Sequence, residues 1–367
     1  MRPETVEPFV WIDLSSLPEA AQSAAIEASA DALQGSLDLT HGPLFRVALF
    51  TLGAARPTRL LMIAHHLVVD GFSWPFVLED LQQAYEQLSR GEDVRLPPRT
   101  TSLKRCVEQL TSYAQSAKVR QELAQWLEQP WNQVVPLLVD HPGRMDLTAS
   151  RRQLSVSLSA EETQLLFERV VAPGKGEFLE VVLAALVHAL RGWTGSETLL
   201  VELTGHGRDA LSAGIDVSRT AGWFVTHTPL LVDLKGARLI GDVLEAVKAQ
   251  LRRWPDRGMG YNLLRYLSRE PRVVEALRSL PQPQVVLNYI GRVPPDPLTS
   301  RLFKPARESL GALTAPQNPA GHLLHCDGVI LQDELTLIWE YGEDLLERTT
   351  VERLAAAYLE ALRAFLR

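Results

Sequence analysis

The chain has 367 residues, enough for two domains of ordinary size or for one large domain. With 46% hydrophobic and 22% charged residues, its composition is typical of a globular protein and excludes a disordered or collagen-like chain. The 44 acidic residues outnumber the 37 basic ones, and the net charge of −7 argues against a nucleic acid or an anionic membrane surface as a partner.

The first part of the chain reads as strands that alternate with helices. Two β-rich runs separated by a loop at 53–58 predict a hairpin. Ser73 is placed to cap the helix that begins at Trp74. The expected elements are strand 9–13, helix 18–34, strands 45–52 and 59–66, and helices 74–91 and 103–127.

Between residues 130 and 150 the hydrophobic periodicity fails and prolines appear, so we place a lobe boundary there. The predicted lobes are 1–150 and 151–367. Because strands and long helices alternate in both, we predict an α/β protein built of two related lobes. The second lobe is expected to contain strand 153–158, a helix capped by Ser159, helix 178–193, strands 198–204 and 229–234, helix 239–253, strands 285–289, 323–331 and 335–341, and helix 347–366.

Cysteine usage and the chain's apolar runs bear on its location. Cys106 and Cys326 have no cysteine or histidine neighbours at metal-site spacing, so the sequence predicts neither a zinc site nor a disulfide framework. No apolar run reaches the roughly 18 residues of a membrane span, and the first residues lack the apolar core of a signal peptide. We therefore expect a cytoplasmic protein with no metal site and no membrane partner.

The sharpest local pattern is His65-His66 followed by Asp70-Gly71, at the end of a predicted strand. Two consecutive side chains of a strand point in opposite directions, so one imidazole can face a channel while the other packs into the fold. Imidazole exchanges protons near neutral pH. Asp70 is placed to hold the following turn, through backbone amides or an arginine, and Gly71 to adopt a backbone angle that other residues resist.

Further stretches fall in a fixed order along the chain: Gly71 to Trp74, Gly205 to Asp209, Arg219 to Phe224, Gly258 to Tyr266 and Leu287 to Gly291. Together with the histidine pair, they resemble the motifs of the condensation-domain superfamily of nonribosomal peptide synthetases, in its epimerization branch. This resemblance implies two chloramphenicol-acetyltransferase-like lobes that form a V-shaped pseudo-dimer with a tunnel between them.

The resemblance also implies a substrate and a chemistry. Members of the branch invert the Cα of an aminoacyl or peptidyl thioester that a peptidyl carrier protein delivers on its phosphopantetheine arm, so the chain itself is expected to bind no cofactor. His66 is the implied acid/base, with His65, Asp70 and Gly71 beside it. The implied tunnel residues are Trp74, Arg208, Trp223 and Tyr289.

The chain departs from the branch at the second acid/base. A glutamate precedes the Gly-His-Gly-Arg stretch in the branch, and here the residue is Thr204, whose hydroxyl needs an activating base of its own. Glu202 shares a strand face with Thr204 but is about 6–7 Å away by strand rise. The other candidates for this side of the pocket are His206, His227 and Asn288. His206 is also part of the branch's motif, where a histidine can simply organise the loop.

Nothing before Phe9 resembles the first segment of the family's N-terminal lobe. We therefore expect either that the chain is an excerpt or a truncated form, or that a partner or a second copy of the chain covers the exposed sheet edge. The primary prediction is Cα proton transfer with L/D epimerization. The alternatives are amide- or ester-forming condensation or cyclisation in the same tunnel, and a catalytically impaired module that binds a carrier domain or recruits another enzyme.

Overall fold

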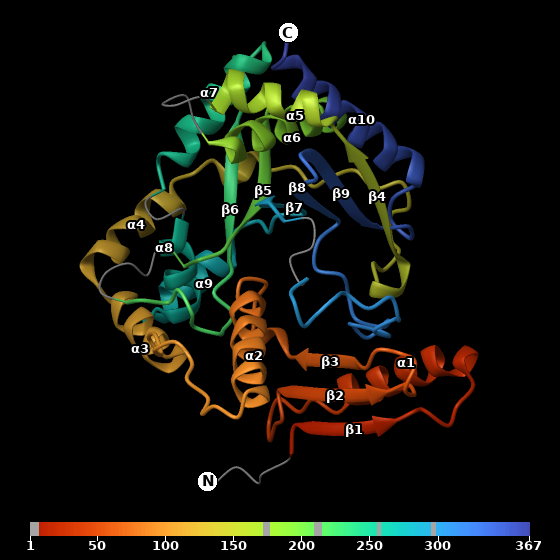
Figure 1. The fold of residues 1–367 in the computed structure, drawn as a ribbon. Coiled ribbons are helices and arrows are strands. Elements are labelled where there is room, and N and C mark those ends of the chain that lie inside the picture. The colour runs from red at the N-terminus through yellow and green to blue at the C-terminus, as the bar shows by residue number, and fades with distance from the viewer. Residues whose placement is uncertain (1–6, 172–176, 209–214, 255–257, 295–298) are drawn as a thin grey trace. The chain divides into compact units, whose positions relative to one another are not determined.

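The computed structural model describes residues 7–171, 177–208, 215–254, 258–294 and 299–367 (Figure 1). The chain divides into two compact units. Unit 1 comprises residues 1–100, 218–223 and 296–316, and unit 2 comprises residues 101–217, 224–295 and 317–367. None of the described helices is both long and apolar enough to cross a membrane.

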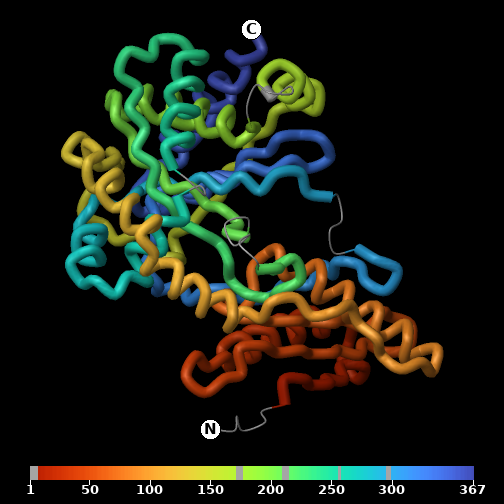
Figure 2. The backbone as a smooth tube through the Cα atoms, turned by 90° about the vertical axis from the view of Figure 1, so that its left-hand side faces the viewer, coloured from red at the N-terminus to blue at the C-terminus, as the bar shows by residue number. Residues whose placement is uncertain are grey.

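Unit 1 is built on a three-stranded sheet, whose strands run side by side in Figures 1 and 2. β1 is parallel to β2, and β2 pairs with β3 in the predicted antiparallel hairpin. A small core of Ile26, Ala48 and Phe50 lies between helix α1 and this sheet. The elements are β1 (Phe9–Asp13), α1 (Glu19–Gly35), β2 (Phe45–Thr51), β3 (Arg59–Ala64), η1 (His66–Val68) and α2 (Trp74–Ser89).

Unit 2 contains, among its described residues, a six-stranded mixed sheet in the order β4-β9-β8-β7-β5-β6. β7 is parallel to both β5 and β8, whereas the other neighbours are antiparallel. The strands are β4 (Arg151–Ser157), β5 (Thr198–Gly205), β6 (Thr226–Asp233), β7 (Val285–Arg292), β8 (Leu324–Leu331) and β9 (Glu334–Gly342).

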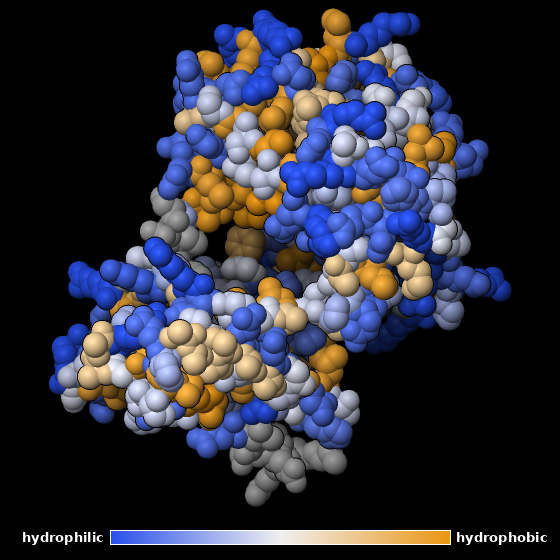
Figure 3. All heavy atoms as spheres, turned by 90° about the vertical axis from the view of Figure 1, so that its right-hand side faces the viewer, coloured by the Kyte–Doolittle hydropathy of each residue, from blue (hydrophilic) through white to orange (hydrophobic). Residues whose placement is uncertain are grey.

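The helices α5, α6, α7 and α10 cover one face of this sheet (Figure 1). The helical segments of unit 2 are α3 (Leu103–Tyr113), α4 (Ala117–Leu127), η2 (Trp131–Gln133), η3 (Thr148–Ser150), α5 (Ala160–Leu166), η4 (Phe167–Val171), α6 (Phe178–Thr194), α7 (Ile240–Leu251), α8 (Met259–Asn262), η7 (Leu263–Leu267), α9 (Pro271–Arg278) and α10 (Arg348–Ala364). Outside these cores, the face of the molecule shown in Figure 3 is largely hydrophilic, with hydrophobic residues in separate patches.

Several element boundaries differ from the sequence prediction by a few residues, and two of the differences have a local cause. The strand expected at 59–66 ends at Ala64, because the chain turns into η1 at His66. The single helix expected at 103–127 is two helices, since the Ser116 side chain accepts a hydrogen bond from the Val119 amide (3.3 Å) and caps α4. Residues 101–150 belong to the compact unit 2, and the lobe boundary at 150 stays a prediction.

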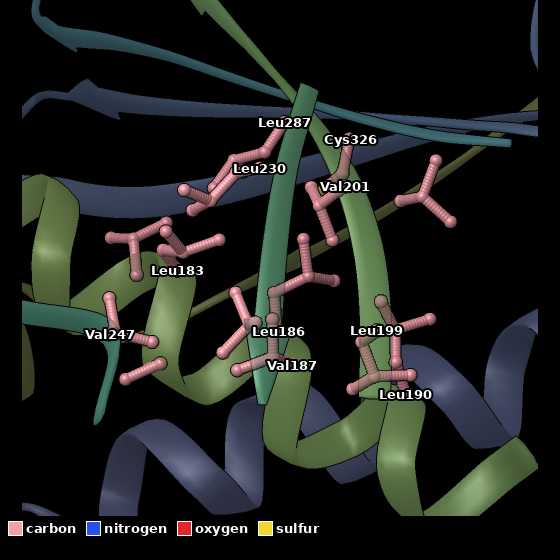
Figure 4. Close-up of a cluster of buried hydrophobic side chains, with 14 of the residues drawn as sticks. Leu183, Leu186, Val187, Leu190, Leu199, Val201, Leu230, Val247, Leu287 and Cys326 are labelled. Atoms are coloured by element: carbon pink, nitrogen blue, oxygen red, sulfur yellow. The ribbon is translucent and has the colours of Figure 1, made fainter. Parts of the chain in front are cut away.

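The core of unit 2 lies between its sheet and α6 (Figure 4). α6 is apolar on nearly all sides, and its residues Leu183, Leu186 and Leu190 are at most 1% exposed. α10 adds a polar anchor, since the buried Tyr358 hydroxyl donates to the Val182 carbonyl oxygen (2.8 Å). Because α6 covers one face of the sheet, the β5 side chains on that face are part of the core. The β5 side chains on the other face are the ones available for a functional site.

We expect Leu186→Ala to lower the free energy of unfolding by about 2–5 kcal/mol, because it leaves a cavity in the packed core. The measurement is chemical denaturation followed by circular dichroism. Leu138→Ala is the matched control, because Leu138 is 62% exposed and its truncation is expected to stay within about 0.5 kcal/mol. An equal loss in both variants would contradict the packing described.

Candidate functional site

The histidine pair lies in unit 1, directly after β3. The His65 backbone amide donates to the Leu44 carbonyl (2.9 Å), and its ring Nδ1 accepts from the Leu67 amide (3.1 Å). The His65 imidazole therefore organises η1. His66 is exposed, and its ring lies 5.4 Å from that of Trp223 between centroids, inclined by 47°. Of the two imidazoles, His66 is the one left accessible to a substrate.

Asp70 and Ser73 form a buried link beneath this turn. Both are at most 1% exposed. The Ser73 hydroxyl donates to Asp70 Oδ1 (2.7 Å), and the Gly222 amide donates to Ser73 Oγ (3.3 Å). The link joins the turn after the histidines to the segment that carries Trp223.

Two expectations for this turn are corrected. Asp70 Oδ1 accepts from the Ser73 hydroxyl, and its expected contact with backbone amides or an arginine stays a prediction. Ser73 precedes α2 as predicted, but its side chain makes no cap hydrogen bond because it is turned to Asp70. Gly71 does not adopt a positive φ, so its presence is not explained by backbone strain.

We expect Asp70→Ala to lower the free energy of unfolding by about 1–3 kcal/mol, because it removes the acceptor of a buried hydroxyl. Thermal denaturation measures this loss. Asp93→Ala, which truncates an exposed carboxylate in the loop after α2, is the control and is expected to be neutral. Equal stability of Asp70→Ala and the wild type would show that the Asp70–Ser73 link contributes nothing.

The segment 218–223 is held on helix α2 of the same unit. The Arg219 guanidinium donates to Glu79 Oε2 (2.6 Å) and to Asp80 Oδ1. The two hydrogen bonds and the carboxylate charges raise the pKa of Arg219, against a smaller opposing effect of desolvation. Trp74, predicted as a tunnel residue, is half-buried at the start of α2. Trp223, which lies beside His66, therefore belongs to a segment that Arg219 ties to helix α2.

The Gly-His-Gly-Arg stretch lies in unit 2, at the end of β5. His206 Nδ1 accepts from the Arg208 amide (3.3 Å), so this ring contacts its own loop. Gly207 has a φ of +67°, and a Cβ at this position would come within 1.8 Å of the Phe224 carbonyl oxygen. Arg208 lies over the Phe224 ring at 4.4 Å and donates to the Val217 carbonyl (2.8 Å). Asp209, the last residue of this stretch, lies outside the described residues.

Alternation along β5 divides its side chains between two faces. Leu199 and Val201 join the core under the helices, so Glu202 and Thr204 lie on the other face. The strand register places Thr204 opposite His227 of β6 and opposite Asn288 of β7. Three of the predicted pocket residues therefore share one face of the unit 2 sheet.

A carboxylate between two histidines lies on this face. Glu202 Oε1 is 2.8 Å from His227 Nδ1 and 3.3 Å from His322 Nε2. Burial alone would raise the pKa of Glu202, but the hydrogen bonds and charges of the two histidines outweigh it and lower the pKa to about 2. Glu202 is therefore an anion at neutral pH. His322, which precedes β8, carries no local sequence signal and was not predicted.

The two remaining predicted residues, Asn288 and Tyr289, point to opposite faces of β7. Asn288 Nδ2 donates to Asp327 Oδ1 (2.9 Å) on the polar face. Tyr289 stacks on Phe178 of α6 with ring centroids 5.4 Å apart, and burial raises its pKa to about 12. The Tyr289 side chain therefore packs against α6, on the face of the sheet opposite to the Asn288 side chain.

Among the described side chains, no group of three histidine, cysteine, aspartate or glutamate residues is arranged to hold a metal ion. Cys106 and Cys326 are buried free thiols, and desolvation raises the pKa of each. The candidate proton-exchanging groups described above are His66 on unit 1 and the cluster of Glu202, His227 and His322 on unit 2.

Comparison with known proteins places these residues in a family. A model described as "Condensation domain" matches residues 3–367. The chain is 44% identical over 365 residues to a linear gramicidin synthase of Brevibacillus parabrevis and 32% identical over 359 residues to a surfactin synthase of Bacillus subtilis. Each alignment covers 98% of this chain but only 5% and 10% of those proteins.

Among solved structures, the epimerization domain from the third module of tyrocidine synthetase B matches with a TM-score of 0.85 and 30% identity, over 98% of this chain and 79% of that one. The match confirms the predicted α/β fold class of chloramphenicol-acetyltransferase-like lobes. The chain therefore belongs to the condensation domain family of nonribosomal peptide synthetases, in its epimerization branch.

Proposed function

We propose that this domain inverts the Cα of an aminoacyl or peptidyl group held as a thioester on a peptidyl carrier protein, with His66 as an acid/base. The observation that carries the proposal is the pairing of an exposed His66 with a His65 whose ring is tied to its own backbone. Membership of the epimerization branch supports this chemistry.

The reaction needs no oxidant and no co-reactant. A base takes the Cα proton, and the electron pair is delocalised onto the thioester carbonyl oxygen as an enolate. An acid on the opposite face of Cα then returns a proton, and exchange with water restores both groups. A positioned acid/base contributes about 10²–10⁴-fold to such a step. The phosphopantetheine arm arrives with the carrier protein, so the proposal requires no cofactor bound by the chain itself.

The neighbours of His66 have supporting roles in this proposal. His65 and Asp70 hold the turn through η1 and Ser73. Trp223 lies against one side of the His66 ring and limits the directions from which a substrate approaches it. We assign Trp74 and Arg208 to substrate contacts, each on its own unit.

The test is Cα exchange in deuterated water. The full chain is mixed with carrier proteins loaded with a panel of L-aminoacyl and peptidyl groups, and deuterium at Cα and the L/D ratio are followed by mass spectrometry and chiral chromatography. We expect the wild type to incorporate deuterium and to produce the D-epimer with at least one member of the panel.

Thr204 favours one alternative, because a threonine hydroxyl is a poor acid/base without an activating base. A wild-type chain that binds loaded carrier but exchanges no Cα proton, while Thr204→Glu does so, would overturn the proposal in favour of a disabled epimerase. Exchange by neither protein, with carrier binding intact, would favour a carrier-binding or recruitment module.

A further inference from the structure

The polar face of β5 and β6 carries an unusual set of side chains around Thr204. Its hydroxyl oxygen is buried, and it has no hydrogen-bond partner among the described residues. The residue directly opposite on β6 is His227. Side chains directly opposite on antiparallel strands have Cβ atoms only about 4.5–5.5 Å apart. The His227 side chain therefore lies in the same small region of this sheet face as the side chain at position 204.

The hydrogen bonds of Glu202 determine which nitrogen of His227 is available. An ionised carboxylate only accepts hydrogen bonds, and Glu202 Oε1 lies 2.8 Å from His227 Nδ1. The Nδ1 atom must therefore carry the hydrogen, which leaves Nε2 as the site that binds or releases a proton. Carboxylates orient catalytic imidazoles by the same contact in other enzymes.

The three side chains differ in exposure in a way that suits this division of roles. The Glu202 side chain is 13% exposed, that of His322 is 27% exposed, and that of His227 is 41% exposed. The Glu202 carboxylate is also held by its second contact, with His322 Nε2 at 3.3 Å. Arg151 in turn donates to the His322 carbonyl oxygen. The most accessible member of the cluster is thus the imidazole whose orientation is fixed by the other two.

We propose that His227 is the acid/base residue of unit 2 and that Glu202 and His322 are its positioning residues. This inference rests on the proposed function. His227 Nε2 exchanges a proton with Cα on one face of the substrate, while His66 does so on the other. For one epimer, the Cα proton passes to His227 and a proton from the His66 imidazolium is added to the enolate. For the other epimer the roles are reversed, so atoms and charges balance in both directions.

Enantiomer-resolved exchange with the full chain tests this assignment. The D- and L-forms of an accepted carrier-bound substrate are incubated separately in deuterated water. His227→Gln is the principal variant, because an amide still donates to Glu202 but transfers no proton at neutral pH. We expect inversion to fall by roughly 10²–10⁴-fold. Deuterium wash-in is expected to persist for only one enantiomer, and for the opposite enantiomer in His66→Ala, since each variant retains one base.

The positioning role of Glu202 has its own measurement. Glu202→Gln removes the negative charge but keeps an oxygen opposite His227, so we expect kcat for inversion to fall about 10-fold or more while KM for the loaded carrier is unchanged. If Glu202 had only a structural role, Glu202→Gln would lower the midpoint of thermal unfolding, and kcat would not fall selectively at an unchanged KM. His141→Ala is the matched control, because His141 is another histidine of unit 2 beside a glutamate, with its Nε2 4.0 Å from Glu347 Oε1. It is expected to behave as the wild type.

The outcomes separate this inference from the proposed function. A wild-type chain without Cα exchange would overturn both. A wild type that inverts Cα, with His227→Gln inverting at a similar rate, would overturn only the role of His227. Equal loss of deuterium wash-in from both enantiomers in folded His227→Gln would also overturn the role of His227 as an acid/base, because that pattern indicates that His227 contributes to substrate binding.

Discussion

The variant His66→Ala is expected to invert Cα roughly 10²–10⁴-fold more slowly than the wild type, because it removes a positioned proton-transfer group. The reason lies in the turn after β3. The His65 ring is occupied by the Leu67 amide, whereas the His66 ring is exposed beside Trp223. The measurement is the rate of D-epimer formation on a loaded carrier protein, with carrier binding recorded in parallel.

A matched histidine of unit 1 serves as the control. His41 lies in the loop before β2 with a side chain 80% exposed, next to Asp38, and His41→Ala is expected to retain the wild-type rate. Inversion by His66→Ala at the wild-type rate would rule out His66 as an acid/base. Loss of carrier binding in the same variant would instead assign His66 to substrate binding.

Gly207→Ala is expected to destabilise the fold severely. Its positive φ costs a residue with a side chain about 1–3 kcal/mol. The added Cβ would also lie 1.8 Å from the Phe224 carbonyl oxygen, and such overpacking typically costs a further 1–3 kcal/mol or so. Backbone cannot rotate away as a flexible side chain can. We expect the free energy of unfolding to fall by roughly 2–6 kcal/mol, as measured by denaturant titration.

Gly236→Ala separates the two costs. Gly236 also has a positive φ, of +84°, but no described heavy atom lies within 4 Å of a Cβ at this position. The substitution therefore carries only the cost of backbone strain, about 1–3 kcal/mol. Equal losses in the two variants would show that the close approach to Phe224 is relieved at no cost.

Local patterns in the sequence predict the elements of this fold well, and they fail where a side chain ends an element. The hydrophobic period runs through Ala114 to Ser116, so one helix is expected where Ser116 caps a second. At the end of β3 the pattern continues to His66, but the backbone turns after Ala64. In both places a hydrogen bond to a neighbouring backbone amide decides the outcome, and the hydrophobic period carries no information about it.

The candidate site, too, is predictable from the sequence in part only. Alternation along β5 is enough to place Glu202 and Thr204 on one face, and the strand register then brings His227 opposite Thr204. His322 was not predicted, because it lies 120 residues from Glu202 in the chain and meets it only through the order of strands in the sheet. The contact of Tyr289 with α6 likewise depends on which face the helix covers.

The discontinuous sequence of unit 1 has a consequence for biosynthesis. Its first 100 residues are synthesised before unit 2 begins, but Gly222, which donates to Ser73, is made only after β5. Glu308, which pairs with Arg59 (2.9 Å), and Leu310, whose carbonyl accepts from Gln34 (2.5 Å), follow only after β7. On the ribosome, the unit that begins the chain is therefore still incomplete when unit 2 starts to emerge: Trp223, which lies beside His66, is synthesised only after β4 and β5 of the unit 2 sheet.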